Sequence, residues 1–78
     1  MPADAEHDIV CRLDAVLAER EMSLAELSRR VGVSVANLSV LKNNRAKAIR
    51  FSTLSAICAA LDCDVAELFG YEPGSPAA

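Results

Sequence analysis

The chain has 78 residues and carries eight Lys and Arg against eleven Asp and Glu, a formal net charge of −3. Hydrophobic residues make up 53% of it and aromatic residues only 4%, a composition that suits short, closely packed helices better than a sheet. Such a length allows one domain with a small core, and no apolar run approaches the roughly 18 residues that span a membrane.

The first 26 residues predict a frayed start followed by one helix. Residues 1–7 show no apolar period, and their acidic composition is unlike that of a signal peptide, so we expect a cytoplasmic protein. From about Asp8 to Glu21, four apolar residues recur at the spacing of a helical face, namely Ile9, Leu13, Val16 and Leu17. This helix is expected to form one wall of the core.

The stretch from Ser23 to Asn44 has the pattern of two short helices joined by a tight turn. Ser23 precedes Glu26 by three residues, which is the spacing of a capping box, and the helix that begins there runs to Val31. Gly32 follows, and glycine takes positive φ without the steric cost of a Cβ atom. We therefore predict a sharp turn at this glycine.

Ser34 is a second N-cap, and the helix after it is expected to end at Asn43 and Asn44. Helices joined so closely cross at a steep angle, which requires a small residue at the crossing, and Ser28 occupies that place. Four apolar side chains of the pair are expected to point inward, namely Leu27, Val33, Leu38 and Leu41.

The connection after this pair, residues 44–50, is polar and basic, and we expect it to face the partner. Phe51 is the next large apolar residue, and Ser52 is a plausible N-cap for a fourth helix. The apolar face of that helix is expected to consist of Leu54, Ile57, Cys58 and Leu61.

The last part of the chain predicts a short fifth helix and a tail. Asp64 and Glu67 repeat the capping-box spacing at the start of this helix, which is expected to end at Gly70. Residues 72–78 have the composition of a disordered tail. Because this region holds more apolar residues than a short helix needs, we also predict a homodimer through Val65, Leu68, Phe69 and Tyr71.

Charge is distributed unevenly along the chain. Residues 1–26 hold seven acidic and two basic residues, and residues 62–78 hold four acidic residues and neither Lys nor Arg. Residues 27–61 hold six basic residues and no acidic one. Unmixed positive charge of this kind favours a polyanionic partner, although a solvated charge run is the simpler alternative.

The two central helices resemble the helix-turn-helix of the Cro/CI-type (XRE) family of phage-repressor-like regulators, in its small stand-alone form. The resemblance extends from about Asp8 to Tyr71 and includes the spacing from Ser23 through Gly32 to Phe51. It implies an all-α, five-helix DNA-binding domain over residues 8–71. An unrelated helical hairpin in a small bundle is the alternative, because capped hairpins are common in all-α domains.

The resemblance also implies that the second helix of the pair enters the major groove of double-stranded DNA, as part of a transcriptional regulator that is expected to act as a repressor. By position, its base-reading residues are Val35, Ala36 and Val40, and its phosphate contacts are Asn37, Ser39, Asn43, Arg45, Lys47 and Arg50. Leu24 departs from the family pattern, since many members carry at this position a glutamine that binds phosphate. The three readers are also apolar, which limits them to thymine methyl groups.

Those apolar readers favour a second hypothesis, a protein-interaction module of the antitoxin or adaptor kind that uses Val35, Ala36 and Val40 as a binding patch. A protein partner gives no reason for residues 27–61 to lack every acid, so DNA binding is the preferred function. We expect no enzyme, because His7 is the only histidine and the chain has no Gly-rich phosphate loop.

The three cysteines, Cys11, Cys58 and Cys63, lack paired C-x-x-C spacing and are expected to be reduced. Cys11 and Cys58 are predicted on buried helical faces, where free cysteine behaves as a small apolar residue. A metal site is the alternative, because His7 and Cys11 would share one face of a helix. We predict no metal and no cofactor.

Overall fold

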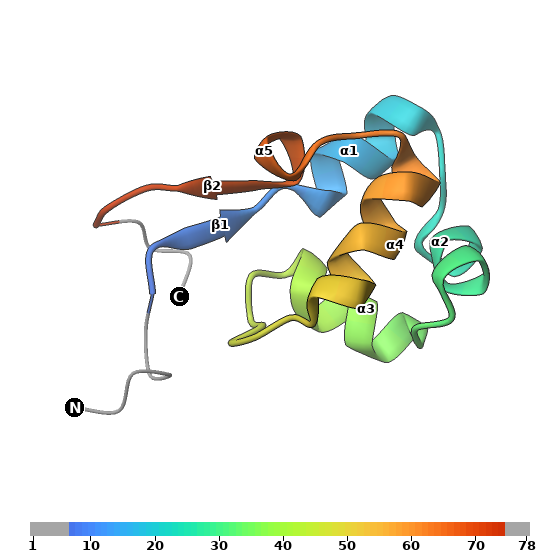
Figure 1. Cartoon of the computed structure of the whole chain (residues 1–78), viewed down its shortest axis with the longest axis horizontal. Helices are drawn as coiled ribbons and strands as arrows, with labels where there is room; N and C mark the ends of the chain where they lie inside the picture. Colours follow the sequence, from blue (N-terminus) through green and yellow to red (C-terminus); the bar gives the residue numbers. More distant parts are fainter. Residues whose placement is uncertain (1–6, 75–78) are drawn as a thin grey trace.

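In the part of the chain that the computed structural model describes, residues 7–74, five short helices pack around one core, with a two-stranded sheet at one end (Figure 1). The elements in chain order are β1 (Ile9–Cys11), α1 (Leu13–Arg20), α2 (Leu24–Val31), α3 (Val35–Lys42), α4 (Phe51–Leu61), α5 (Val65–Leu68) and β2 (Phe69–Tyr71). The predicted all-α fold with five helices is confirmed, and the sheet is a small addition to it.

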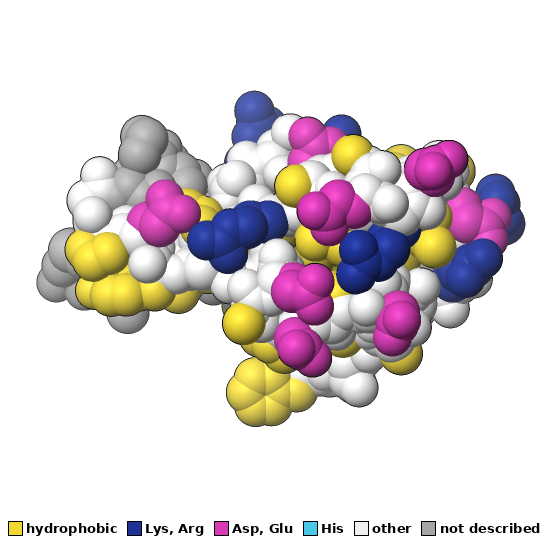
Figure 2. Space-filling model, turned by 90° about the horizontal axis from the view of Figure 1, so that it is seen from above, with side chains coloured by type: hydrophobic (Ala, Val, Ile, Leu, Met, Phe, Trp, Pro, Cys, Tyr) yellow, Lys and Arg dark blue, Asp and Glu magenta, His cyan; other side chains and the backbone are white. Residues whose placement is uncertain are grey.

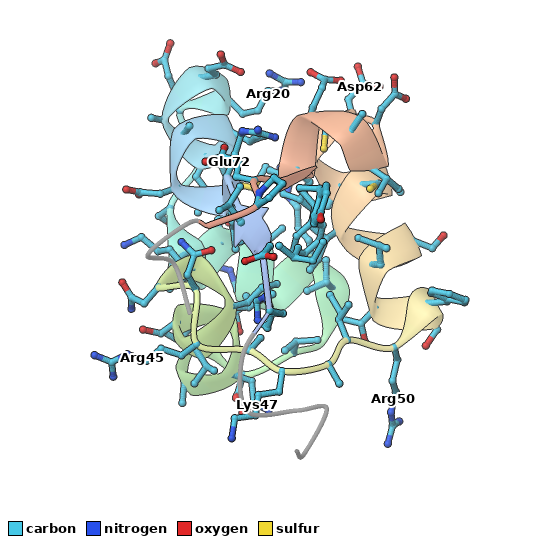
Figure 3. All side chains as sticks on the ribbon, turned by 90° about the vertical axis from the view of Figure 1, so that its left-hand side faces the viewer. Arg20, Arg45, Lys47, Arg50, Asp62 and Glu72 are labelled. Atoms are coloured by element: carbon cyan, nitrogen blue, oxygen red, sulfur yellow. The ribbon has the colours of Figure 1, made fainter. Side chains whose placement is uncertain are left out.

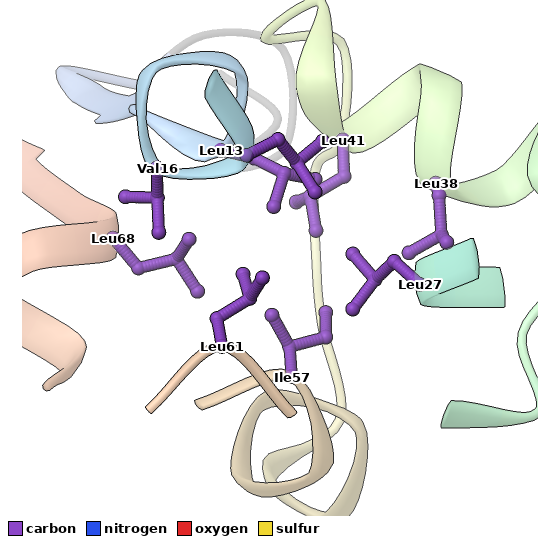
Figure 4. Packing of buried hydrophobic residues seen from close by; sticks show 9 residues of the cluster. Leu13, Val16, Leu27, Leu38, Leu41, Ile57, Leu61 and Leu68 are labelled. Carbon is purple, nitrogen blue, oxygen red and sulfur yellow. The ribbon is translucent and has the colours of Figure 1, made fainter. Parts of the chain in front are cut away.

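Every helix contributes to the core, which is wholly apolar among the described residues (Figure 4). Its side chains are 0–7% exposed and comprise Leu13, Val16, Leu17, Leu27, Leu38, Leu41, Ile57, Leu61 and Leu68. Full burial of one such side chain stabilises the fold by about 1.5–3 kcal/mol. Three of the four inward-facing residues predicted for the central pair are confirmed, whereas Val33 is only partly buried against the core.

The central pair has the predicted caps and turn. The Ser23 hydroxyl accepts from the Glu26 N–H at 3.0 Å, and the Ser34 hydroxyl accepts from the Asn37 N–H at 3.1 Å. Gly32 ends α2 with a φ of 72°, a left-handed conformation that favours glycine. Local sequence thus determines where α2 and α3 begin and how the chain turns between them.

Ser28 lies within α2, one turn before Gly32. It is half-buried, and its hydroxyl donates to the Val33 carbonyl at 2.6 Å. This side chain therefore satisfies a carbonyl of the turn that joins α2 to α3.

The structure corrects the predicted start of the first helix. Residues Ile9–Cys11 form β1 and pair antiparallel with β2, so that Ile9 lies opposite Tyr71. The Arg12 N–H extends this pairing by donating to the Leu68 carbonyl at 2.7 Å, and α1 starts only at the next residue. Ile9 is consequently 41% exposed instead of belonging to the helical stripe.

Cys11 likewise lies on β1, half-buried, and not on the buried helical face predicted for it. The reason is compositional, because a short apolar segment with two β-branched residues suits a strand as well as a helix. The predicted frayed segment, residues 1–7, lies outside the described residues except for His7.

The fifth helix also ends earlier than predicted, at Leu68 instead of Gly70. Phe69 already has the extended φ of −128°, and Gly70 is the central residue of β2. A Cβ atom at Gly70 would come within 2.8 Å of the Arg12 guanidinium carbon, so this glycine leaves room for the Arg12 side chain beside β2 and does not act as a helix cap.

Glu72, which we assigned to the tail, continues the sheet. Its N–H donates to the Asp8 carbonyl at 2.8 Å, and its carboxylate lies 3.4 Å from the Arg12 guanidinium. Residues 75–78 of the predicted tail lie outside the described part of the chain.

The start of α4 differs from the prediction as well. Arg50 is its N-cap residue, in an extended conformation, and Ser52 lies inside the first turn. The helix therefore begins two residues earlier than predicted, with Ile49 partly buried against the core and Phe51 87% exposed. Among residues 7–74, no helix combines the length and hydropathy that crossing a bilayer requires.

Candidate nucleic-acid interface

One face of α3 is turned away from the core. Leu38 and Leu41 fix the orientation of the helix, because both are buried beneath it. The predicted base readers are consequently on the outside, with Val35 45% exposed, Val40 43% exposed, and Ala36 also exposed.

A shallow hollow of about 740 Å³ lies between α3 and the following connection. We call residues 43–50 the basic loop. Five of the nine predicted site residues line this hollow, namely Asn37, Val40, Arg45, Lys47 and Arg50. The structure therefore brings one base reader and four phosphate contacts together on a single concave surface, next to the start of α4.

The remaining predicted residues lie outside that hollow, and two of them are bonded to each other. The Asn43 side-chain amide donates to the Ser39 carbonyl at 2.9 Å and to the Ser39 hydroxyl at 3.2 Å. This pairing closes the last turn of α3, so both residues have a structural role at the end of the helix.

The three cations of the basic loop have no acidic partner among the described residues. Arg45, Lys47 and Arg50 are exposed, and within residues 7–74 none of them lies within ion-pairing distance of a carboxylate. In Figure 3 all three lie along the lower margin of the molecule, whereas Asp62 and Glu72 lie in the upper half.

The cations of α2 are in a different state. The Glu26 carboxylate pairs with Arg30 at 2.8 Å and also with Arg29, and it does so instead of reaching back to the Ser23 N–H as the predicted capping box requires. Hydrogen bonds from Arg30 and then Arg29 hold the pKa of Glu26 below its usual value. One carboxylate thus offsets part of the positive charge of these two Arg residues.

Lys42, at the end of α3, lies 3.8 Å from the Asp14 carboxylate of α1. Three of the six basic residues counted in residues 27–61 thus have an acidic neighbour that lies outside this range of the sequence. The face seen in Figure 2 shows the same mixing, with acidic and basic side chains interspersed.

The basic loop is tied to β1 by contacts that the sequence analysis missed. The Asn44 side-chain oxygen accepts from the Cys11 N–H at 2.6 Å, and His7 Nε2 lies 3.1 Å from the Ala46 carbonyl oxygen. Asn44 has a φ of 61°, a left-handed conformation that asparagine tolerates better than most residues. The Asn43-Asn44 pair at a helix end was the available signal for this turn.

His7 and Cys11 do not share a helix, which removes the geometry assumed for the alternative metal site. Within residues 7–74 no three His, Cys, Asp or Glu side chains gather closely enough to hold a metal ion. His7 instead contacts the basic loop, as described above.

A capped helix pair with a glycine turn, an outward α3 and an adjacent basic loop defines a helix-turn-helix protein of the DNA-binding class. The family of the Cro/C1-type HTH DNA-binding domain matches residues 12–74. The chain belongs to this family.

Among known proteins, the chain is similar to the uncharacterized HTH-type transcriptional regulator YozG of Bacillus subtilis (strain 168). The two are 56% identical over 63 residues, which covers 81% of this chain and 75% of that protein. No solved structure matches the chain.

Proposed function

We propose that this protein regulates transcription as a repressor, with α3 in the major groove and the basic loop on the flanking phosphates. The observation that supports this most directly is the hollow in which the α3 side chains Asn37 and Val40 meet three cations without an acidic neighbour among the described residues. Repression requires only occupancy of the DNA, whereas activation requires a further surface that recruits another protein.

Direct reading of bases falls to Val35, Ala36 and Val40 in this proposal. Their methyl groups cannot make the bidentate hydrogen bonds that discriminate between bases by about 1–3 kcal/mol each, but they can contact the C5-methyl group of thymine. The preferred half-site is therefore rich in A·T pairs. A narrow A·T minor groove would additionally attract a cation such as Arg50.

Phosphate contacts are assigned to two groups of residues. Arg45, Lys47 and Arg50 supply charge, and Asn37 supplies a neutral hydrogen-bond donor beside them. Ser39 and Asn43 complete the predicted set, and they would contact phosphate through groups not already used in their mutual bond. Arg29 and Arg30 contribute less, because Glu26 already binds them.

The proposed active form is a homodimer, since one small helix-turn-helix buries little DNA surface and a two-fold dimer reads half-sites about one turn apart. Leu68 of the predicted contact set is fully buried in the core, and Phe69 is partly buried against it. Val65 and Tyr71, 52% and 69% exposed, remain available for the contact. Sedimentation that finds a monomer both free at high concentration and on palindromic DNA would refute this part.

Selection of binding sites from a random DNA library tests the proposal as a whole. We expect an A·T-rich half-site, and we expect replacement of its thymines by uracil to lower the affinity because the C5-methyl groups are lost. A motif dominated by G·C pairs, or full affinity for the uracil duplex, would contradict the assignment of the readers. Failure to bind any duplex at low salt would favour the protein-interaction module instead.

A further inference from the structure

The end of α4 brings two cysteines together. The Cys63 N–H donates to the Cys58 carbonyl at 3.1 Å, and the Asp62 N–H donates to the Ala59 carbonyl at 3.4 Å. Asp62 has a left-handed φ of 51°. This pair of bonds is the Schellman motif, in which the first and sixth residues commonly make a side-chain contact. Both of those residues are cysteine here.

The two thiols line one shallow hollow on the surface. Cys58 and Cys63 are each partly buried, and both line a shallow apolar hollow together with Leu54 and Val65. Burial raises the pKa of Cys63, and the adjacent Cys58 thiol raises this pKa further. Two thiols that influence each other in this way are close neighbours.

We propose that Cys58 and Cys63 form a dithiol site, which low-molecular-weight disulfides such as oxidised glutathione convert into an intramolecular disulfide. In the first step one cysteine thiolate attacks the small disulfide, forms a mixed disulfide and releases one thiol. The second cysteine thiolate then attacks the protein sulfur of that bond and releases the other thiol. Two protein thiols are oxidised and one small disulfide is reduced to two thiols.

The fold favours this reaction through position and not through thiol reactivity. A disulfide requires closely spaced Cα atoms, and the backbone bond between Cys63 and Cys58 holds the two residues together in the native state. Because the pKa of Cys63 is raised, little of its thiolate is present at neutral pH, so the rate should increase as the pH rises toward 9.

Cys11 provides a natural internal control. It lies on β1, where it pairs with Phe69, and it does not line the hollow that holds the other two thiols. Burial raises its pKa too, but Cys11 has no neighbouring thiol in the Schellman turn.

Trypsin places Cys11 on a different peptide from the other two cysteines. Residues 51–78 contain no Lys or Arg, so Cys58 and Cys63 stay together in one peptide. The experiment equilibrates the folded full chain with oxidised and reduced glutathione, alkylates the remaining thiols and weighs the peptides. We expect peptide 51–78 to lose two hydrogens and to escape alkylation. The peptide with Cys11 should remain a thiol or carry glutathione.

Three comparisons decide the result. Cys58→Ser and Cys63→Ser should each abolish the internal disulfide, and Cys11→Ser should preserve it. The equilibrium ratio of internal to mixed disulfide should be about tenfold or more higher in the folded chain than in denaturant. The proposal is overturned if peptide 51–78 carries two glutathiones, if Cys11 is cross-linked as readily, or if folding does not raise the ratio.

Discussion

The chain has two clusters of positive charge, and they differ in what surrounds them. On α2, Arg29 and Arg30 lie three and four residues after Glu26, so a single carboxylate reaches both. In the basic loop, Arg45 and Lys47 lie beyond the end of α3, and no carboxylate of the described residues pairs with them. Within residues 7–74, only the second cluster has no carboxylate partner and so offers its charge to a polyanion.

This difference shows what a count of charges along a sequence omits. Residues 27–61 contain no acid, yet two acids outside that range, Glu26 and Asp14 of α1, form ion pairs with three of its six basic residues. Helical spacing and tertiary packing determine which cations are free. The following predictions test whether the two clusters really behave differently.

The largest effect is expected from removing charge in the basic loop. Arg45→Ala combined with Lys47→Ala should weaken binding to all DNA sequences by about tenfold or more at low salt, because two phosphate contacts are lost. The slope of log K against log salt should become shallower by about 1.8, since each contact accounts for about 0.9. Filter binding over a range of salt concentrations measures both quantities.

Arg29→Ala with Arg30→Ala is the matched control, because it removes the same net charge. We expect this variant to change the slope by less than half as much, since Glu26 already occupies both guanidinium groups. Equal changes in the two double variants would mean that the two clusters are equivalent and that the comparison is wrong.

Loosening the basic loop should have the next largest effect. Asn44→Ala removes the acceptor of the Cys11 N–H and places alanine at a φ of 61°, which should lower the free energy of unfolding by about 1–2 kcal/mol. Asn44→Gly keeps the backbone conformation accessible and loses only the hydrogen bond, so its cost should be smaller. Urea titration compares the stability of the variants. An unchanged unfolding midpoint for Asn44→Ala would show that the hydrogen bond from Cys11 to Asn44 does not stabilise the fold.

Removing the acidic partner of Arg29 and Arg30 should make their cluster resemble the basic loop in its attraction for DNA. Glu26→Gln removes the carboxylate that binds Arg29 and Arg30, and we expect it to raise nonspecific DNA affinity by about two- to fivefold, the range of a surface ion pair. Glu21→Gln is the control for net charge alone, because Glu21 belongs to no ion pair among the described residues. If both variants gain the same affinity, the effect comes from total charge and the pairing is irrelevant.

The smallest effect concerns acid stability. The pKa of Glu26 is lowered in the folded chain, so its carboxylate stabilises the fold above the unfolded pKa, and this contribution disappears as the pH falls through the lowered folded value. Between about pH 6 and pH 3 the Tm of the wild type should therefore fall slightly more than that of Glu26→Gln. If the plots of Tm against pH are parallel for the two proteins, the ion pairs of Glu26 do not contribute to stability.

The helix-turn-helix itself was predictable because short-range signals determine it. Ser23, Gly32 and Ser34 act within a few residues of themselves, through caps and a left-handed turn, and the structure has each of them as expected. The apolar spacing identified Leu27 and Leu38 as core residues for the same reason.

The sheet, and the hydrogen bond that joins β1 to the basic loop, were not predictable from such short-range signals. Pairing of Ile9 with Tyr71 joins the two ends of the described chain, and no local pattern in the sequence indicates it. The hydrogen bond from Cys11 to Asn44 depends on that pairing, because β1 must first lie beside the basic loop. The site residues were identified from family resemblance, whereas which neighbouring cations are paired with acids depends on contacts with Glu26 of α2 and Asp14 of α1.

The docking face is the central claim, and an NMR titration of the amide signals with duplex DNA at low salt tests it most directly. We expect the largest shifts in residues 35–50, which include the outward face of α3 and the basic loop, and small shifts in β1, α5 and β2. If the largest shifts instead fall in residues 62–72, the protein does not bind DNA through this face.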